Sequence, residues 1–222
     1  MKITFIQHSS FLLELNEYVL LFDYFDGDLP PLPKNELIVF SSHRHGDHYH
    51  RRIFNLPAKE FVLSDDIPKD QVPNSEGIHW IAPHQTITVG NLVISTLKST
   101  DEGVAFIITI ENRVIYFAGD LNNWFWEEEG EGYTAPMAQA YRKELERLPK
   151  HLDLAFVPVD PRLGKWAFLG ATDLLARVSV DYLVPMHLWG EFALVSSLKD
   201  EVQENTVTIL APSANGEVWR IS

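Results

Sequence analysis

Four of the nine histidines in this chain lie within the ten residues Ser41–His50, which read SSHRHGDHYH. The segment directly follows an apolar run that predicts a buried strand. In an extended segment residues i and i+2 point the same way, so His43 and His45 can bind one ion together. Asp47 and His48 then face the neighbouring space, where a second ion could bind. The spacing predicts a metal site, and the alternative is a polar surface loop that happens to be rich in histidine.

The chain has 222 residues and no cysteine, which excludes thiolate ligands and disulfides. A metal must therefore be held by imidazole and carboxylate groups. Zinc accepts both kinds of ligand, and manganese or iron also suit nitrogen and oxygen donors. We expect one or two Zn²⁺ ions, with manganese or iron as the alternatives.

The composition is that of an ordinary globular protein, with 45% hydrophobic and 22% charged residues. The length suits a single domain over residues 1–222. A formal net charge of -13 repels polyanions, so we expect a small-molecule substrate and no nucleic-acid partner. We find no run of about 18 apolar residues and no signal peptide, so we expect a cytoplasmic protein without a membrane span. The sequence does not indicate an oligomeric state.

Many short strands and a few helices must position the candidate ligands. The predicted strands are 4–15 with an internal turn, 18–22, 37–40, 60–64, 79–82, a hairpin over 86–93 with its turn at 90–91 that continues through 94–97, 104–111, 114–118, 154–159, 182–185, 206–210 and 217–220. The predicted helices are 135–148, 171–178 and 194–203. Strands that come early and helices that mix in later indicate two stacked sheets with helices outside.

Two further strands end in residues that could join the site. Val114–Asp120 reads VIYFAGD, and Tyr182–His187 reads YLVPMH. Taken alone, Asp120 could be a turn residue and His187 a core histidine. Beside the histidine motif of Ser41–His50, these two alternatives are less favoured.

These three motifs, in this order, resemble the metallo-β-lactamase fold hydrolases. His43–His48 is similar to the first metal motif of that superfamily, and the strand ending in Asp120 resembles the one whose aspartate bridges two metals. His8–Leu12 and Leu20–Asp23 resemble the branch that contains UlaG-like lactonases. The match covers about residues 5–187. It implies an α+β fold, a four-layer αββα sandwich of the metallo-β-lactamase type.

The resemblance also implies a role for each matching residue. The implied metal ligands are His43, His45, Asp47, His48, Asp120 and His187. The first two would bind one metal, Asp120 would lie between both metals, and the other three would bind the second. Asp47 would also orient the nucleophile, which makes it the candidate catalytic residue.

The sequence departs from the family at one ligand of the first metal. The family supplies a third histidine from the loop before the strand that begins at Val104, but Leu97–Val104 reads LKSTDEGV. Asp101 is the best replacement, and Glu102 or water are the alternatives. We therefore predict either one firmly bound metal or two metals of unequal affinity, with the second site tighter.

Three other residues are candidates for supporting roles. Asp23 ends a buried strand, so we expect it to hydrogen-bond a ligand histidine, although it could be a plain turn carboxylate. His8 should lie near the site without being a firm ligand. Arg162, held by Asp160, could bind an anionic substrate group or could form a structural pair in a loop.

Three functions remain open at this level. The first is a metal-dependent hydrolase that uses metal-activated water on a small ester, lactone, amide or phosphoester. The second is a nuclease of the metallo-β-lactamase type, which the net charge disfavours. The third is a non-catalytic metal-binding protein of the same fold, which the near-complete ligand set disfavours.

Overall fold

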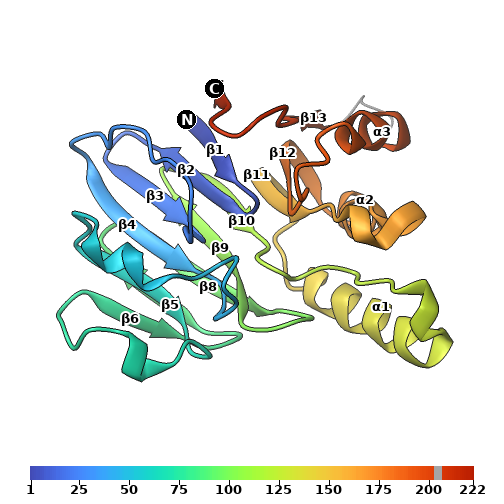
Figure 1. Ribbon diagram of the computed structural model, residues 1–222, viewed down its shortest axis with the longest axis horizontal. Helices are drawn as coiled ribbons and strands as arrows, with labels where there is room; N and C mark the ends of the chain where they lie inside the picture. Colours follow the sequence, from blue (N-terminus) through green and yellow to red (C-terminus); the bar gives the residue numbers. More distant parts are fainter. Residues whose placement is uncertain (203–206) are drawn as a thin grey trace.

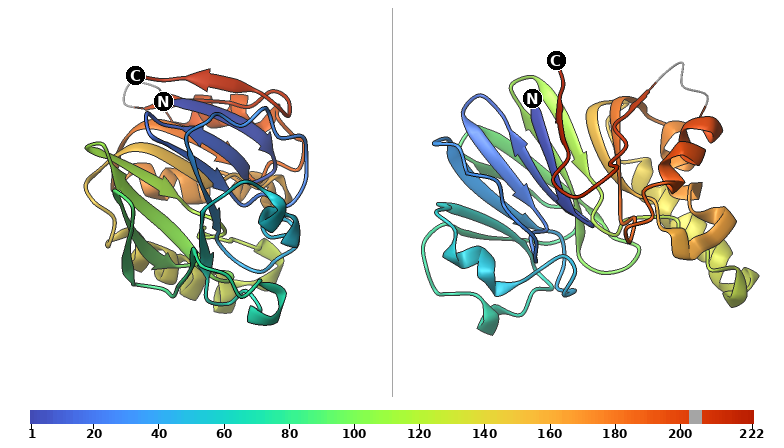
Figure 2. Two further views of the ribbon diagram at one scale, coloured as in Figure 1. Left: turned by 90° about the vertical axis from the view of Figure 1, so that its left-hand side faces the viewer. Right: turned by 45° about the horizontal axis from the view of Figure 1, so that its top comes forward.

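Continuous apolar runs form the centres of two sheets that pack face to face (Figures 1 and 2). The computed structural model describes residues 1–202 and 207–222. The first sheet has the order β14-β1-β2-β3-β4-β5-β6 and the second has the order β13-β12-β11-β10-β9-β8-β7. Residues Tyr18–Phe22 are buried throughout, as expected for a strand covered on both faces.

The strands of the first sheet are β1 (Lys2–Gln7), β2 (Ser10–Glu14), β3 (Tyr18–Phe22), β4 (Glu36–Ser41), β5 (Glu60–Ser64), β6 (Ile78–Ile81) and β14 (Val218–Arg220). The strands of the second sheet are β7 (Thr86–Val89), β8 (Leu92–Lys98), β9 (Val104–Ile110), β10 (Arg113–Phe117), β11 (His151–Pro158), β12 (Ser179–Met186) and β13 (Thr208–Ile209). Strands β3 to β6 run parallel to one another, and so do β10 to β13. Each sheet therefore has a set of strands whose carboxyl ends lie at one edge.

Aromatic rings fill the space between the sheets just before the chain reaches the predicted site. Phe22 stacks on Phe117 of the opposite sheet, with ring centroids 4.6 Å apart, and on Phe40 at 5.0 Å. Phe156 packs against both Phe22 and Phe117. All four side chains are fully buried. These rings fix the ends of β3, β4, β10 and β11, and each of these strands is followed within four residues by a predicted site residue or its partner.

The helices are distributed unevenly over the two outer faces. Figure 1 shows α1 (Glu131–Leu145), α2 (Leu169–Leu175) and α3 (Leu194–Glu201) beside the second sheet. The outer face of the first sheet packs against the 3₁₀ helix η1 (Arg51–Asn55) and nearby loops, through buried Ile53 and Ile67. Further 3₁₀ helices are η2 (Lys69–Gln71), η3 (Glu127–Glu129) and η4 (Pro161–Trp166). The predicted four-layer α+β sandwich is confirmed, with a 3₁₀ helix and loops as the fourth layer.

Most predicted elements are present with shifted ends. Helix α1 begins at Glu131 and not at Ala135, α2 begins two residues earlier than predicted, and β11 begins three residues earlier. The predicted helix through Gln203 and the predicted strand from Thr206 each have an end outside the described residues. Among the described residues, no helix is long and apolar enough to cross a lipid bilayer.

Candidate metal centre

The candidate ligands lie just after strands of both sheets, at the edge where the parallel strands end. The segment that carries His43, His45 and His48 follows β4, and the Gly119–Asp120 turn follows β10. His187 directly follows β12. The structure brings all six predicted ligands together, as two adjacent groups of histidine and aspartate side chains.

Asp120 lies between the two groups. Its Oδ2 is 3.5 Å from Nε2 of His43. Its Oδ1 is 3.3 Å from Nε2 of His48 and 3.5 Å from Nε2 of His187. One carboxylate therefore presents one oxygen to the first group and the other oxygen to the second, which is the geometry that a bridging ligand requires.

The first group consists of His43, His45, Asp101 and Asp120. Nε2 of His43 is 3.1 Å from Nδ1 of His45, and Nδ1 of His45 is 3.6 Å from Oδ2 of Asp101. Asp101 thus stands where the sequence predicts a substitute for the missing histidine. The side chains of His45 and Asp101 are 41% and 45% exposed, so half of this group is open to solvent. Glu102 is also close, with a carboxylate oxygen 3.4 Å from Nε2 of His45.

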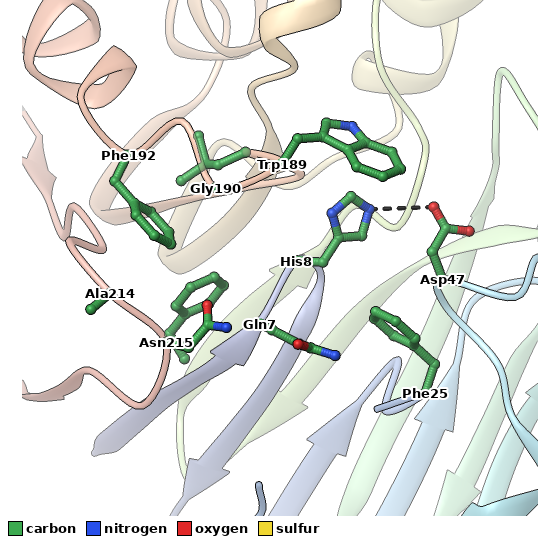
Figure 3. A pocket seen from close by; sticks show the side chains of 11 residues that line it. Gln7, His8, Phe25, Asp47, Trp189, Gly190, Phe192, Ala214 and Asn215 are labelled. Atoms are coloured by element: carbon green, nitrogen blue, oxygen red, sulfur yellow. Dashed lines mark ion pairs between the residues drawn. The ribbon is translucent and has the colours of Figure 1, made fainter. Parts of the chain in front are cut away.

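The second group consists of His8, Asp47, His48 and His187. His48 and His187 are buried, and His8 is mostly buried. Nε2 of His8 is 3.4 Å from Oδ2 of Asp47, and Figure 3 shows the two side chains facing each other. His8 reaches this place because the backbone N–H of His187 donates to the carbonyl of His8 at 3.2 Å, which ties the end of β1 to the end of β12. The sequence placed His8 near the site, and the structure places it within ligand distance.

Carboxylates orient two of the histidines from behind. Nδ1 of His48 is 2.7 Å from Oδ2 of Asp23, and Nδ1 of His187 is 2.8 Å from Oδ2 of Asp160. A carboxylate at Nδ1 holds the proton there and leaves Nε2 free as a lone-pair donor. Asp23 thus has the position that the sequence predicted. The contact between Asp160 and His187 was missed, because the sequence linked Asp160 only to Arg162.

Two neighbours hold these carboxylates in turn. Asp23 accepts hydrogen bonds from the backbone N–H and the hydroxyl of Ser42, at 2.7 and 2.6 Å. Asp160 accepts from Nε and Nη2 of Arg162, at 3.0 and 2.6 Å. The structural pair proposed for Arg162 is therefore present.

The buried nitrogens of the centre point to a missing partner. Nε2 of His8, of His48 and of His187, together with Oδ1 of Asp120, are buried without a hydrogen-bond partner in the part of the chain that the structure describes. A buried polar atom without a partner is costly and uncommon. Nε2 of His48 and of His187 converge with Oδ1 of Asp120, and two imidazole nitrogens with a carboxylate oxygen match the donor set of a zinc-type metal ion. The residues present therefore fit a bound metal.

Burial sets the protonation of these groups. It lowers the pKa of His43 to about 2, with His48 nearby adding to the effect. Burial likewise lowers the pKa of His48 and of His187, so these rings are neutral and ready to bind a cation. Burial raises the pKa of Asp120 well above its usual value, and the charges of Asp101 and Asp47 raise it further.

Burial also raises the pKa of Asp23 to about 7, against lowering contributions from His43 and Ser42. For Asp47 and Asp160 burial acts in the same direction, but the groups beside them outweigh it. His8 and His48 lower the pKa of Asp47, and His187 and Arg162 lower that of Asp160. Both carboxyl groups are therefore ionised at neutral pH.

The backbone is strained where the chain enters the centre. His8, Asp23, His187 and Trp189 have positive φ angles of 51°, 43°, 65° and 51°. Side chains other than glycine rarely adopt this region, and such residues cluster at functional sites. Gly119 has φ 52°, and a Cβ atom there would lie 2.7 Å from Cβ of Ser42, so the turn that presents Asp120 requires glycine.

A polar cleft of about 280 Å³ opens onto the centre. Its walls include Asp47, Asp101, Asp120 and His187, together with Trp126 and Arg162. The guanidinium of Arg162 lies over the ring of Trp189 at 4.6 Å and near that of Trp126 at 5.7 Å. Arg162 therefore both pairs with Asp160 and lines a cleft, so a structural pair and a substrate-binding role for Arg162 are compatible.

Comparisons with known proteins agree with this geometry. The model of the Beta-lactamase superfamily domain matches residues 2–187. A UPF0173 metal-dependent hydrolase of Desulforamulus reducens is 27% identical over 254 residues, with both chains covered completely. These two comparisons do not distinguish the UlaG-like branch of the superfamily, so membership of that branch stays a prediction.

Solved structures share the fold. Igni18, a metallo hydrolase of the archaeon Ignicoccus hospitalis, superposes with a TM-score of 0.66 at 18% identity, covering 100% of this chain and 99% of that one. CmlA, a diiron β-hydroxylase of Streptomyces venezuelae, gives a TM-score of 0.64 at 12% identity, covering 99% of this chain and 54% of that one.

Proposed function

Because the chain belongs to the beta-lactamase superfamily, we propose that it is a metal-dependent hydrolase of a small ester, lactone, amide or phosphoester. The observation that carries the proposal is the pair of unpartnered Nε2 atoms of His48 and His187, which lie 3.3 and 3.5 Å from the unpartnered Oδ1 of Asp120 within the described chain. Such an arrangement has no structural purpose unless a cation completes it.

We propose zinc as the metal, held by His43, His45, Asp101 and Asp120 in the first group and by Asp47, His48, His187 and Asp120 in the second. When bound, the metal lowers the pKa of the water that it coordinates and polarises the bond to be hydrolysed. CmlA is a diiron enzyme of the same fold, which supports iron as the alternative. The second group is the more buried one, which supports the tighter binding proposed for it.

Asp47 is the proposed catalytic residue. The nearby His8 and His48 outweigh the effect of burial and lower the pKa of Asp47, so it is a carboxylate that can accept a proton from the attacking water. It lines the polar cleft, and His8 holds it from the other side. The oxygen of water adds to the carbonyl or phosphoryl group, and Asp47 takes a proton from this water. Asp47 then gives the proton to the leaving group as the bond between the leaving group and the carbonyl or phosphoryl atom breaks.

Arg162 is proposed to bind a polar or anionic part of the substrate in the polar cleft. Its pairing with Asp160 fixes the guanidinium in a defined orientation beside Trp126 and Trp189. A nucleic-acid substrate is not proposed, because the net charge of -13 opposes binding of a polyanion.

The test is a panel of nitrophenyl esters, lactones, amides and phosphodiesters, incubated with zinc-loaded protein. We expect turnover of at least one class, and a loss of about 100-fold or more in kcat for Asp47→Asn. The matched control is Asp65→Asn, an exposed aspartate after β5, which should keep full activity. Absence of turnover for every class by metal-loaded protein would support a non-catalytic metal-binding protein instead.

A further inference from the structure

A second cavity, of about 520 Å³, adjoins the metal centre beside His8 and Asp47 (Figure 3). Five of the eleven residues that line it have large apolar side chains: Phe5, Phe25, Leu188, Trp189 and Phe192. Ala214 and Asn215 lie across the cavity from Asp47. Its volume is in the range of pockets that hold small molecules.

The cavity is continuous with the candidate ligands. His8 and Asp47 belong to the second ligand group and also line the cavity. The ring of His8 lies between Trp189, at a centroid distance of 4.5 Å, and Phe25, at 6.2 Å. A molecule whose reacting atom lies beside Asp47 can therefore extend directly into this space.

Trp189 is held over the cavity by specific interactions. It is 49% exposed, which is unusual for a tryptophan, and its backbone φ is 51°. Its indole N–H donates to Oδ2 of Asp160 at 3.3 Å, and the guanidinium of Arg162 covers its ring. A large apolar ring that is kept exposed at a strained position beside a metal centre points to a ligand that covers it.

The cavity and the polar cleft differ in the charged side chains that line them. The described residues that line the cavity include no lysine or arginine, and Asp47 is their one carboxylate. A carboxylate or phosphate placed among Phe5, Phe25 and Phe192 would lose its hydration without gaining a cation. The polar cleft has Arg162 and is the place for a charged group.

We propose that this cavity binds an uncharged alkyl or aryl group of the substrate, so that the substrate of the proposed hydrolase is a small apolar ester, lactone or amide. The inference rests on the proposed function, because it concerns the same site. The scissile bond lies beside Asp47, the apolar group fills the cavity, and the more polar end points to Arg162.

The test uses ligands with one metal-binding head and different tails. Acetohydroxamate, hexanohydroxamate and the hexano analogue ending in a carboxylate are titrated into zinc-loaded protein by calorimetry. Burial of four additional CH₂ groups in the cavity should make hexanohydroxamate bind at least about tenfold more tightly than acetohydroxamate. The carboxylate-ended tail should lose this gain.

Substitutions at Ala214 locate the tail. Ala214 is exposed at the rim, so Ala214→Trp can fill the cavity without disturbing the core, and the gain for the hexano tail should disappear. Ala214→Lys should instead favour the carboxylate-ended tail. Ala140→Trp and Ala140→Lys, at an exposed alanine of α1, are the matched controls and should behave like the wild type.

The outcomes separate this inference from the proposed function. Equal binding of all tails to the wild type, or a gain that survives Ala214→Trp, overturns the cavity proposal even if esters are hydrolysed. The same tail comparison with hexanamide and acetamide, followed by NMR, needs no metal. A preference for hexanamide that Ala214→Trp removes supports the cavity even if no hydroxamate binds and no substrate is turned over.

Discussion

Oδ2 of Asp23 lies 2.7 Å from Nδ1 of His48, and both side chains are completely buried. This contact joins the end of β3 to the histidine motif that follows β4, and it directs Nε2 of His48 toward Asp120. Asp160 and His187 repeat the arrangement in the second sheet, at 2.8 Å. The two sheets thus contribute equivalent carboxylate–histidine pairs to one centre.

Replacement of Asp23 should weaken metal binding without removing a ligand. Asp23→Asn keeps the size of the side chain but loses the charge that fixes the tautomer of His48, so we expect a loss of about 10–100-fold in metal affinity. Competition with a chromophoric chelator measures this loss. Asp70→Asn is the control, because Asp70 is an exposed aspartate of η2 outside the metal centre. An affinity for Asp23→Asn equal to that of the control would show that the contact has no influence on the metal.

Asp120→Ala should affect both metals at once. The substitution removes the carboxylate whose oxygens lie 3.3–3.5 Å from His43, His48 and His187. We expect a lower metal content and loss of turnover, measured by plasma mass spectrometry on the same sample as the kinetic assay. A variant with wild-type metal content and full turnover would reduce Asp120 to a turn residue.

Asp101→Ala should distinguish the two groups. Asp101 contributes to the half-exposed first group and not to the second. The variant should lose the more weakly bound metal and keep the other, which a zinc titration by calorimetry resolves as one binding step in place of two. Asp70→Ala, at an exposed aspartate of η2, is the control. Two equally tight steps that both survive Asp101→Ala would contradict unequal sites.

Metal affinity should rise with pH. The raised pKa of Asp120 and the pKa of about 7 for Asp23 mean that the metal-free protein keeps protons on these buried carboxyl groups to a higher pH than on exposed aspartates. A bound cation favours the ionised forms, so protons are released on binding and compete with the metal as the pH falls. The buried imidazoles release none at this pH, because their pKa values are lowered.

We expect about one to two protons released per protein on zinc binding near pH 7. Calorimetry in buffers of different ionisation enthalpy counts them, and Asp120→Asn should release fewer. An affinity that is constant between about pH 5 and pH 8, with no proton release, would be incompatible with this assignment.

The sequence predicted the parts of the centre whose ligands are close in the chain or stand at strand ends. The spacing of His43 and His45 indicates convergence directly, since an extended segment points both side chains the same way. The place of Asp101 followed from the position where a histidine was missing. The stacked sheets followed from the order of strands and helices.

The contacts that were missed join residues on different strands that are far apart in the sequence. His8 lies within ligand distance only because the end of β1 hydrogen-bonds the backbone of His187, about 180 residues later. Asp160 supports His187 because β11 and β12 are neighbouring parallel strands. A local sequence pattern does not show which distant residues come into contact. Arg162 is only two residues from Asp160, so the sequence predicted Arg162 as its partner. The start of helix α1 was predicted too late, at Ala135, because its first turn, Glu131–Thr134, has no apolar spacing to mark it.

The most direct test of a metal-dependent hydrolase is turnover measured as zinc is added to chelator-treated protein, with the best substrate of the panel. We predict no turnover without metal, an increase with added zinc, and saturation by two equivalents per chain, with Asp120→Ala inactive throughout. Turnover that is independent of added metal, or no turnover when both sites are filled, would contradict metal-dependent hydrolysis by this protein.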